Sequence, residues 1–117
     1  MNKIQAYDDF WNSFGLNAYD ENSVPEDAVL PYITYELVNA DFGTEVAVNA
    51  SIWDKSYSWK RLSELDMEIT DKITKGGMMV NYDDGAFWVR KLRSQRVSEN
   101  DASIKRILMD LELEFID

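Results

Sequence analysis

The 117-residue chain contains no histidine and no cysteine, and these two absences exclude several kinds of active site. Without cysteine there is no disulfide, no thiolate nucleophile and no cysteine-ligated zinc or iron–sulfur centre. Without histidine there is no Ser–His or Cys–His catalytic pair and no imidazole metal ligand. Only carboxylate, lysine and tyrosine chemistry is left for catalysis. The lack of cysteine also fits a reducing compartment.

Basic residues are scarce as well, because 12 Lys and Arg oppose 22 Asp and Glu, for a formal net charge of −10. This balance disfavours nonspecific binding to DNA or to anionic membranes, since both need a basic surface. No apolar run reaches the length of a transmembrane helix, and the sequence starts without the apolar stretch of a signal peptide. We therefore expect a soluble protein that is not secreted and has no membrane partner.

Apolar side chains, in contrast, are numerous enough for one hydrophobic core. They make up 45% of the residues and include four Trp, six Tyr and five Phe. A chain of this length is expected to bury roughly two-thirds of the surface of its unfolded state in a single domain. No linker, repeat or low-complexity tract divides the sequence. We therefore expect one domain over residues 1–117.

Two segments have the spacing of amphipathic helices, with apolar residues every three or four positions. The first runs from about Asn2 to Phe14 and ends at Gly15, a typical helix terminator. The second begins after a cap at Ser56 or Ser58. Gly76-Gly77 ends it. The apolar stripes are Ile4, Tyr7, Phe10, Trp11 and Phe14 in the first, and Trp59, Leu62, Leu65, Ile69 and Ile73 in the second.

Five segments have the alternating pattern of strands. They are Tyr32–Ala40, Val46–Ile52, Met78–Tyr82, Ala86–Leu92 and Ile104–Ile116. Turn signals at 41–44 and 83–85 predict two hairpins, while the acidic segment 17–27 is interpreted as a surface loop and the polar segment 94–103 as a turn. The fold class is therefore α+β, in the order α–β–β–α–β–β–β. We expect an antiparallel or mixed five-stranded sheet with two helices packed on one face.

Four pairs of adjacent carboxylates raise the question of a metal or acid–base site. A calcium loop needs a regular series of oxygen ligands around a sharp glycine turn, and no such spacing occurs. Gly76-Gly77 lacks the Lys and Ser or Thr of a phosphate-binding loop. We therefore expect no catalytic, cofactor-binding or metal-binding residue, and interpret the pairs as solvated surface. They are Asp8-Asp9, Asp20-Glu21, Glu26-Asp27 and Asp83-Asp84.

Charge is divided unevenly along the chain: residues 1–30 carry one basic and six acidic side chains, whereas residues 76–93 carry three basic and two acidic. An acidic surface on one copy facing a basic surface on the next fits a head-to-tail ring; an ordinary charged sheet edge explains the same pattern. Trp53 is out of phase with the apolar residues of its strand, which fits either packing on Tyr57 or a subunit interface. The candidate interface residues are Tyr19, Asp20, Glu21, Glu26, Asp27, Trp53, Arg90, Arg93 and Arg96.

Four stretches carry a family resemblance. They are the short N-terminal amphipathic helix, Leu30–Tyr35 at the first strand, Ile52–Trp59 before the second helix, and Leu108–Phe115 in the last strand. Together with the order of elements they cover nearly the whole chain. This combination resembles the tail terminator, or tail-completion, family of head–tail joining proteins in long-tailed siphophages.

The resemblance implies a non-enzymatic structural protein of a phage or prophage, made in the cytoplasm of the bacterial host and located in the tail or neck of the virion. Such proteins form a hexameric ring on the last ring of tail-tube subunits, stop tube polymerisation and present a surface to the head connector. The implied partners are further copies of this chain, a tail-tube protein and a head connector or neck protein. DNA passes through the ring without sequence-specific binding.

Three other functions stay open from the sequence. Neck and connector proteins of the same particles share this size and composition. A small acidic inhibitor or immunity-type protein acting on a basic partner is supported by the net charge alone. A carboxylate-dependent enzyme without a recognised motif is the third. The oligomeric state separates the ring from the inhibitor, because the inhibitor acts as a monomer or dimer.

Overall fold

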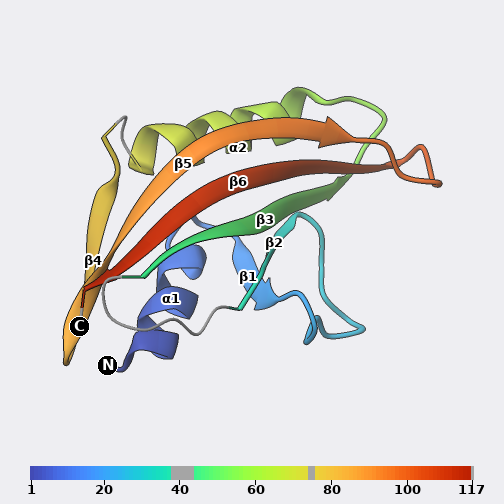
Figure 1. Ribbon diagram of the computed structural model, residues 1–117. Coiled ribbons are helices and arrows are strands. Elements are labelled where there is room, and N and C mark those ends of the chain that lie inside the picture. Colours follow the sequence, from blue (N-terminus) through green and yellow to red (C-terminus); the bar gives the residue numbers. More distant parts are fainter. Residues whose placement is uncertain (38–43, 74–75, 117) are drawn as a thin grey trace.

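The structure, a computed structural model, describes residues 1–37, 44–73 and 76–116. Within these residues the elements are α1 (Lys3–Asn12), β1 (Asn17–Asp20), β2 (Tyr32–Tyr35), β3 (Glu45–Lys55), α2 (Lys60–Ile73), β4 (Met78–Tyr82), β5 (Gly85–Val97) and β6 (Ile104–Ile116). The strands form one sheet in the order β1-β2-β3-β6-β5-β4. β6, the last strand of the chain, therefore lies between β3 and β5 in the middle of the sheet (Figure 1).

The expected five strands are wrong by one, because the described residues contain six. The additional strand is β1, which lies in the segment interpreted as a loop. It pairs in parallel with β2, from Asn17 opposite Tyr32 to Asp20 opposite Tyr35, whereas all other described pairs are antiparallel. A four-residue edge strand has one neighbour and shows too little alternation to be recognised. The fold is thus α+β with a mixed sheet.

The first predicted hairpin is present but differs in length. β2 pairs antiparallel with β3, from Tyr32 opposite Trp53 to Tyr35 opposite Ala50. Residues 38–40 of the predicted strand and 41–43 of the predicted turn lie outside the described residues. β3 continues past its predicted end to Lys55, because all eleven of its residues pair with β6.

β5 is longer than predicted and runs through residues 94–97, which were expected in a turn. Its pairing with β6 shifts between Lys91 and Arg93, so that Leu92 has no partner. Such a bulge resets the alternation of side chains, and Lys91 and Ser94 end up opposite Leu111 and Met109 on one face. The strand therefore continues where its sequence pattern breaks, and the polar turn is limited to residues 98–103.

The core lies on one face of the sheet, here called the inner face. On β6 the side chains of this face are all buried, as the sequence pattern predicts: Ile107, Met109, Leu111, Leu113 and Phe115. α1 reaches this face where the Lys3 ammonium lies 4.8 Å from the centre of the Phe115 ring. α2 reaches it where Asp66 pairs with Lys91 of β5. Both helices therefore cover the same face, as expected.

α1 fills its end of the core with aromatic rings. Tyr7 and Phe10 contact Phe87 of β5, at 5.9 and 6.0 Å between ring centres. Tyr35 of β2 lies 5.4 Å from Tyr7, and burial together with a hydrogen bond to Asp8 raises the pKa of Tyr35 well above its ordinary value. Ile4, expected in the apolar stripe, is instead 53% exposed. It lies in the first turn of the helix, next to the exposed Gln5.

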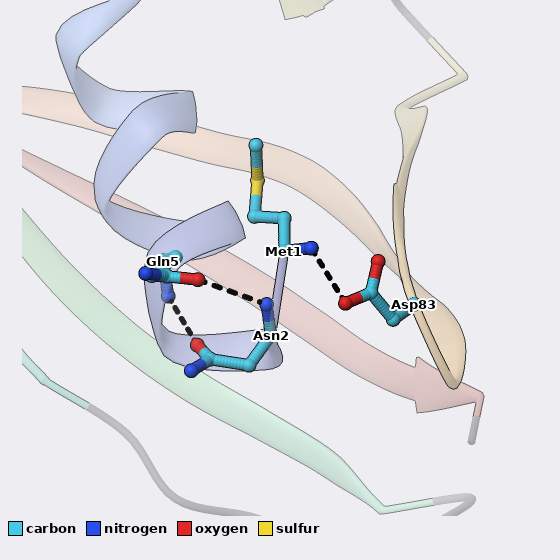
Figure 2. A network of polar contacts seen from close by, with 4 residues as sticks. All are labelled: Met1, Asn2, Gln5 and Asp83. Carbon is cyan, nitrogen blue, oxygen red and sulfur yellow. Dashed lines mark hydrogen bonds and ion pairs between the residues drawn. The ribbon is translucent and has the colours of Figure 1, made fainter.

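The start of α1 is tied to the turn between β4 and β5 (Figure 2). The Asn2 side chain accepts a hydrogen bond from the Gln5 N–H at 2.9 Å, and the Gln5 side chain accepts one from the Asn2 N–H at 3.1 Å. This reciprocal capping satisfies two N–H groups that a helix leaves free. The Met1 ammonium lies 2.6 Å from the Asp83 carboxylate, and the Asp83 N–H donates to the Met1 carbonyl at 2.8 Å. These contacts fix the start of α1 to the turn of the β4–β5 hairpin.

α2 begins one residue later than a cap at Ser58 predicts, because Trp59 holds the cap position and its carbonyl accepts from the Ser63 N–H at 2.9 Å. The Ser58 hydroxyl accepts a hydrogen bond from the Lys60 N–H at 3.1 Å, and the Ser56 hydroxyl accepts one from the Ser58 N–H at 3.1 Å. Its buried residues Leu62, Ile69 and Ile73 are three of the five predicted for its stripe. The remaining two, Trp59 and Leu65, are partly buried against the core.

Gly77, just before β4, is the glycine whose replacement is expected to disturb the fold most. Its φ is +93°, and a Cβ there would lie 2.7 Å from both the Trp88 Nε1 and the Val89 carbonyl oxygen. Gly15 has a similar φ of +84° but open space around it. We expect Gly77→Ala to lower the free energy of unfolding by about 2–3 kcal/mol, against about 1 kcal/mol for Gly15→Ala. Urea unfolding measures both losses; equal losses would contradict a steric role for the β5 backbone.

Candidate interaction surfaces

The face of the sheet opposite the helices, here called the outer face, divides into two halves. The strand register assigns the alternate side chains of each strand to it. The half nearer the β5–β6 turn carries Tyr19, Tyr32, Thr34, Ser51, Trp53, Arg106 and Leu108. The half nearer the β4–β5 turn carries Glu45, Asn49, Trp88, Arg90, Arg93, Asp110, Glu112 and Glu114. The first, here called the aromatic half, carries three aromatic rings and is mostly uncharged, and the second, the charged half, is mostly charged.

Trp53 is the centre of the aromatic half, and it points away from the core as its phase predicts. Its indole Nε1 donates to the Thr34 hydroxyl at 2.9 Å, and the Arg106 guanidinium lies 4.8 Å from the ring centre. The Arg106 Nε also donates to the Ser51 hydroxyl at 2.9 Å. Tyr57, the alternative partner considered for Trp53, is 86% exposed. Trp53 therefore packs across the strands of the sheet and remains partly accessible.

The basic residues of the charged half are paired within the same copy. The Arg90 guanidinium lies 3.0 Å from Glu112, and that of Arg93 lies 2.6 Å from Asp110. Both pairs join β5 to β6, directly across the strand register. These two arginines therefore offset carboxylates of their own sheet, and present far less positive charge to a partner than the sequence indicates.

Acidic side chains dominate the remainder of the charged half. Glu112 and Glu114 raise the pKa of Glu45, since each added negative charge disfavours ionisation of its neighbour. The Arg90 guanidinium acts in the opposite direction. A shallow hollow between these side chains is lined further by Trp88 and Leu113. The negative charge of these three carboxylates would attract a basic side chain of a partner.

The described residues hold no group of three or more Asp or Glu side chains placed to bind a metal ion. In the same part of the chain, no helix combines the length and the apolarity needed to cross a membrane.

A cluster of basic side chains lies at the end of the molecule where α2 starts and β5 meets β6. We call it the cationic end and define it by Lys55, Lys60, Arg61, Arg96 and Lys105. Trp59 is its centre, because the Arg96 guanidinium lies 5.0 Å and the Lys105 ammonium 5.5 Å from the ring. Such cation–π contacts stabilise exposed pairs by about 0.5–1 kcal/mol. They fix the position of two cations at this end.

Asp54 lies beneath the cationic end and is buried. Its Oδ1 accepts a hydrogen bond from the Lys55 N–H at 2.8 Å. Its Oδ2 has no hydrogen-bond donor among the described residues and lies 3.8 Å from the Arg61 Nε. Arg61 itself is exposed. The buried carboxylate therefore offsets one of the five positive charges of the cationic end, and the other four exceed it.

The segment between β1 and β2, residues 21–31, forms the acidic connection. Glu21, Glu26 and Asp27 are exposed, and no salt bridge links them to another described residue. Val29 is 74% exposed. The Glu21 N–H donates to the Tyr35 carbonyl at 2.9 Å and so anchors the start of the connection to β2. The acidic charge is thus presented on a segment that is attached to the sheet at both ends.

The nine residues proposed from the sequence fall in four places. Tyr19 and Trp53 lie on the aromatic half of the outer face, and Arg90 and Arg93 on its charged half. Asp20 ends β1, and Glu21, Glu26 and Asp27 lie on the acidic connection. Arg96 lies at the cationic end. The cationic end as a whole was not predicted from the sequence. Its basic residues lie at 55–61 and 96–105, and the pairing of β3 with β6 brings these two segments together.

Comparisons with known proteins place the fold but not the family. No protein-family model matches the chain, and no curated protein matches it in sequence. Several solved chains are similar in fold, and for one of them the TM-score is 0.65 at 13% sequence identity; that match covers 97% of this chain and 85% of the other. That structure is described as the virion of a native gene transfer agent (GTA) particle. At this identity the likeness concerns the fold alone.

Proposed function

We propose that the protein is a structural component of a phage or phage-like virion, and that it forms a ring which caps the tail tube, ends tail polymerisation and provides the surface for joining to the head. The observation that carries this proposal is the likeness in fold, over nearly the whole chain, to a chain from a gene transfer agent virion. The station at the end of the tail tube is taken from the sequence resemblance to siphophage tail terminators, because the likeness in fold names only a virion.

The surfaces described above suit an assembly protein better than an enzyme. The outer face, the cationic end and the acidic connection each present charge or aromatic rings on a different part of the molecule. A ring protein needs several such surfaces, because each copy contacts two neighbours, the tube below and the connector above. No reacting group is needed for this role, and we assign none.

Ring formation is tested on the purified chain by size-exclusion chromatography with light scattering, followed by negative-stain electron microscopy. We expect a hexamer with a central hole, either for the chain alone or after addition of the tail-tube protein. A strict monomer in the presence of tube ends would contradict the ring. A dimer that binds a basic protein would instead favour the acidic inhibitor.

The station in the particle is tested by deleting the gene in the phage or prophage that carries it. We expect tails of uncontrolled length that lack heads, because nothing then stops growth of the tube. Tails of normal length that fail to join heads would instead indicate a neck or connector protein. Normal infectious particles would contradict both assignments.

A further inference from the structure

We propose that the cationic end of one copy binds the acidic connection of a second copy, and that this head-to-tail contact is the one that closes the ring. This inference rests on the proposed function, which supplies the closed ring, and it adds the residues through which the copies contact one another. It replaces the pairing suggested by the sequence, in which the basic side was placed at residues 76–93.

The distribution of charge in space is sharper than its distribution along the chain. Residues 53–61 and 94–107, which pair around the cationic end, carry six basic and three acidic side chains. The remainder of the chain carries six basic and nineteen acidic side chains. One end of each copy is therefore net positive on a strongly negative body. Two copies attract one another when this end of one faces an acidic surface of the other.

The charges on both surfaces are available for a partner. In the described part of the chain, no salt bridge involves Lys55 or Lys60, and none involves Glu21, Glu26 or Asp27. Arg90 and Arg93 differ, since each already has a carboxylate of its own copy within 3.0 Å. Arg61 lies farther from its own carboxylate, at 3.8 Å from Asp54, so a contact between copies would use Lys60 together with Arg61 rather than these two arginines.

Each of the two surfaces also presents an apolar side chain to solvent. Tyr57, between Lys55 and Lys60, is 86% exposed, and Val29, two residues after Asp27, is 74% exposed. They are the two most exposed large hydrophobic side chains among the described residues. Tyrosine is enriched at the centre of protein interfaces, because it combines a large apolar ring with a hydroxyl. Their placement beside complementary charges favours burial of both in one contact.

The geometry allows one copy to use both surfaces at once. In Figure 1 the β3–α2 connection runs above the right-hand end of the sheet, and the β1–β2 connection hangs below it. Two different surfaces that recognise one another make a heterologous contact, which closes into a ring when the rotation between copies permits. Trp59 holds Arg96 and Lys105 in place before binding, which lowers the entropy lost on association.

The negative body of the protein disfavours nucleic acid as the occupant of the cationic end. A DNA duplex at this end would lie against a chain of net charge −10. A second copy supplies exposed carboxylates and an apolar side chain on one short segment. The test therefore includes a DNA duplex as a competing partner.

Two neutralising variants and two matched controls test the contact by sedimentation velocity. Lys60→Gln with Arg61→Gln, and Glu26→Gln with Asp27→Asn, are each expected to weaken association of the full chain at least about tenfold. Lys3→Gln with Lys72→Gln removes the same positive charge from the start of α1 and the end of α2, outside both surfaces, and should leave association unchanged. Glu64→Gln with Glu68→Gln, on exposed positions of α2, is the control for the acidic side.

Charge-swapped variants provide the decisive measurement. Lys60→Glu with Arg61→Glu, and Glu26→Lys with Asp27→Lys, should each be monomeric alone, because like charges then face one another. Mixed in equal amounts they should assemble, with the two variants alternating. Raising the ionic strength from about 0.1 M to about 1 M shortens the screening length from roughly 10 Å to roughly 3 Å and should weaken the mixed assembly.

The outcomes separate this contact from the function proposed above. Rings that form unchanged with Lys60→Gln and Arg61→Gln would overturn the contact and leave the ring standing. Recovery of association in the mixture as open filaments, without rings, would support the contact and count against the capping ring. No association of the wild-type chain and none in the mixture would overturn the contact. Loss of DNA binding in the same variant, with self-association unchanged, would assign the cationic end to nucleic acid.

Discussion

Replacement of Phe87 by alanine is expected to lower the free energy of unfolding by about 3–5 kcal/mol, which is a large fraction of the roughly 5–15 kcal/mol typical of a domain. Phe87 is fully buried on β5, and its ring contacts Tyr7, Phe10, Tyr82 and Phe115 at 5.8–6.5 Å between centres. It therefore joins α1 to three strands of the sheet. Removal of the ring leaves a cavity where these elements meet.

Two further variants separate packing from a general effect of substitution in β5. Phe87→Leu retains most of the volume and should lower the free energy of unfolding by less than about 1.5 kcal/mol. Leu92→Ala, at the exposed bulge, should change it by less than about 0.5 kcal/mol. Urea unfolding followed by tryptophan fluorescence measures all three. A loss for Phe87→Ala no larger than that for Phe87→Leu would show that α1 closes over the space.

Replacement of Asp66 by alanine is expected to lower the free energy of unfolding by about 3 kcal/mol. The Asp66 Oδ1 lies 3.2 Å from the Lys91 ammonium and accepts a hydrogen bond from the Ser94 hydroxyl at 2.6 Å. The Lys91 ammonium donates to the same hydroxyl at 2.6 Å. The side chains of Lys91 and Asp66 are only 9% and 19% exposed, so removal of the carboxylate leaves a poorly hydrated cation under α2.

A double-mutant cycle distinguishes this explanation from a loss of packing. Lys91→Met removes the cation and leaves Asp66 with its Ser94 hydrogen bond, so we expect a loss of about 1–2 kcal/mol. The double variant contains no buried charge and should be within about 1 kcal/mol of the wild type. Additive losses in the double variant would indicate that the two side chains do not interact.

The parts of the fold that were predictable are those in which one residue pattern matches one environment. Along β6, an apolar residue recurs at every second position from Ile107 to Phe115, because these side chains all face the core. The end of β4 at Tyr82 and the start of β5 at Gly85 follow from the turn residues Asp83 and Asp84 between them. β1 was not predictable, since its four residues depend on β2, a segment that comes after an intervening connection. The bulge at Leu92 hid the end of β5 for a related reason, because it changes the phase of the pattern.

The candidate surfaces were harder to predict than the fold, and the arginines explain why. Arg90, Arg93 and Arg96 are close in sequence and look like one basic cluster. The structure assigns the first two to pairs with Glu112 and Asp110, whereas Arg96 stacks on Trp59 at another part of the molecule. Charge available to a partner depends on strand register and on the bulge, neither of which is visible in composition. Trp53 was placed correctly because phase alone decides the face on which a strand residue lies.

The position of β6 also governs when the protein can fold. β6 pairs with β3 on one side and β5 on the other along almost its full length, yet it is the last strand to be synthesised. Until it leaves the ribosome, β3 and the β4–β5 hairpin have no shared neighbour, and their inner faces remain exposed to solvent. Productive folding is therefore expected only after β6 has left the ribosome, with a rate limited by closure of the long segment between β3 and β6. Nascent chains in this interval present unpaired strand edges, so the yield of folded protein should depend on chaperones that bind such edges.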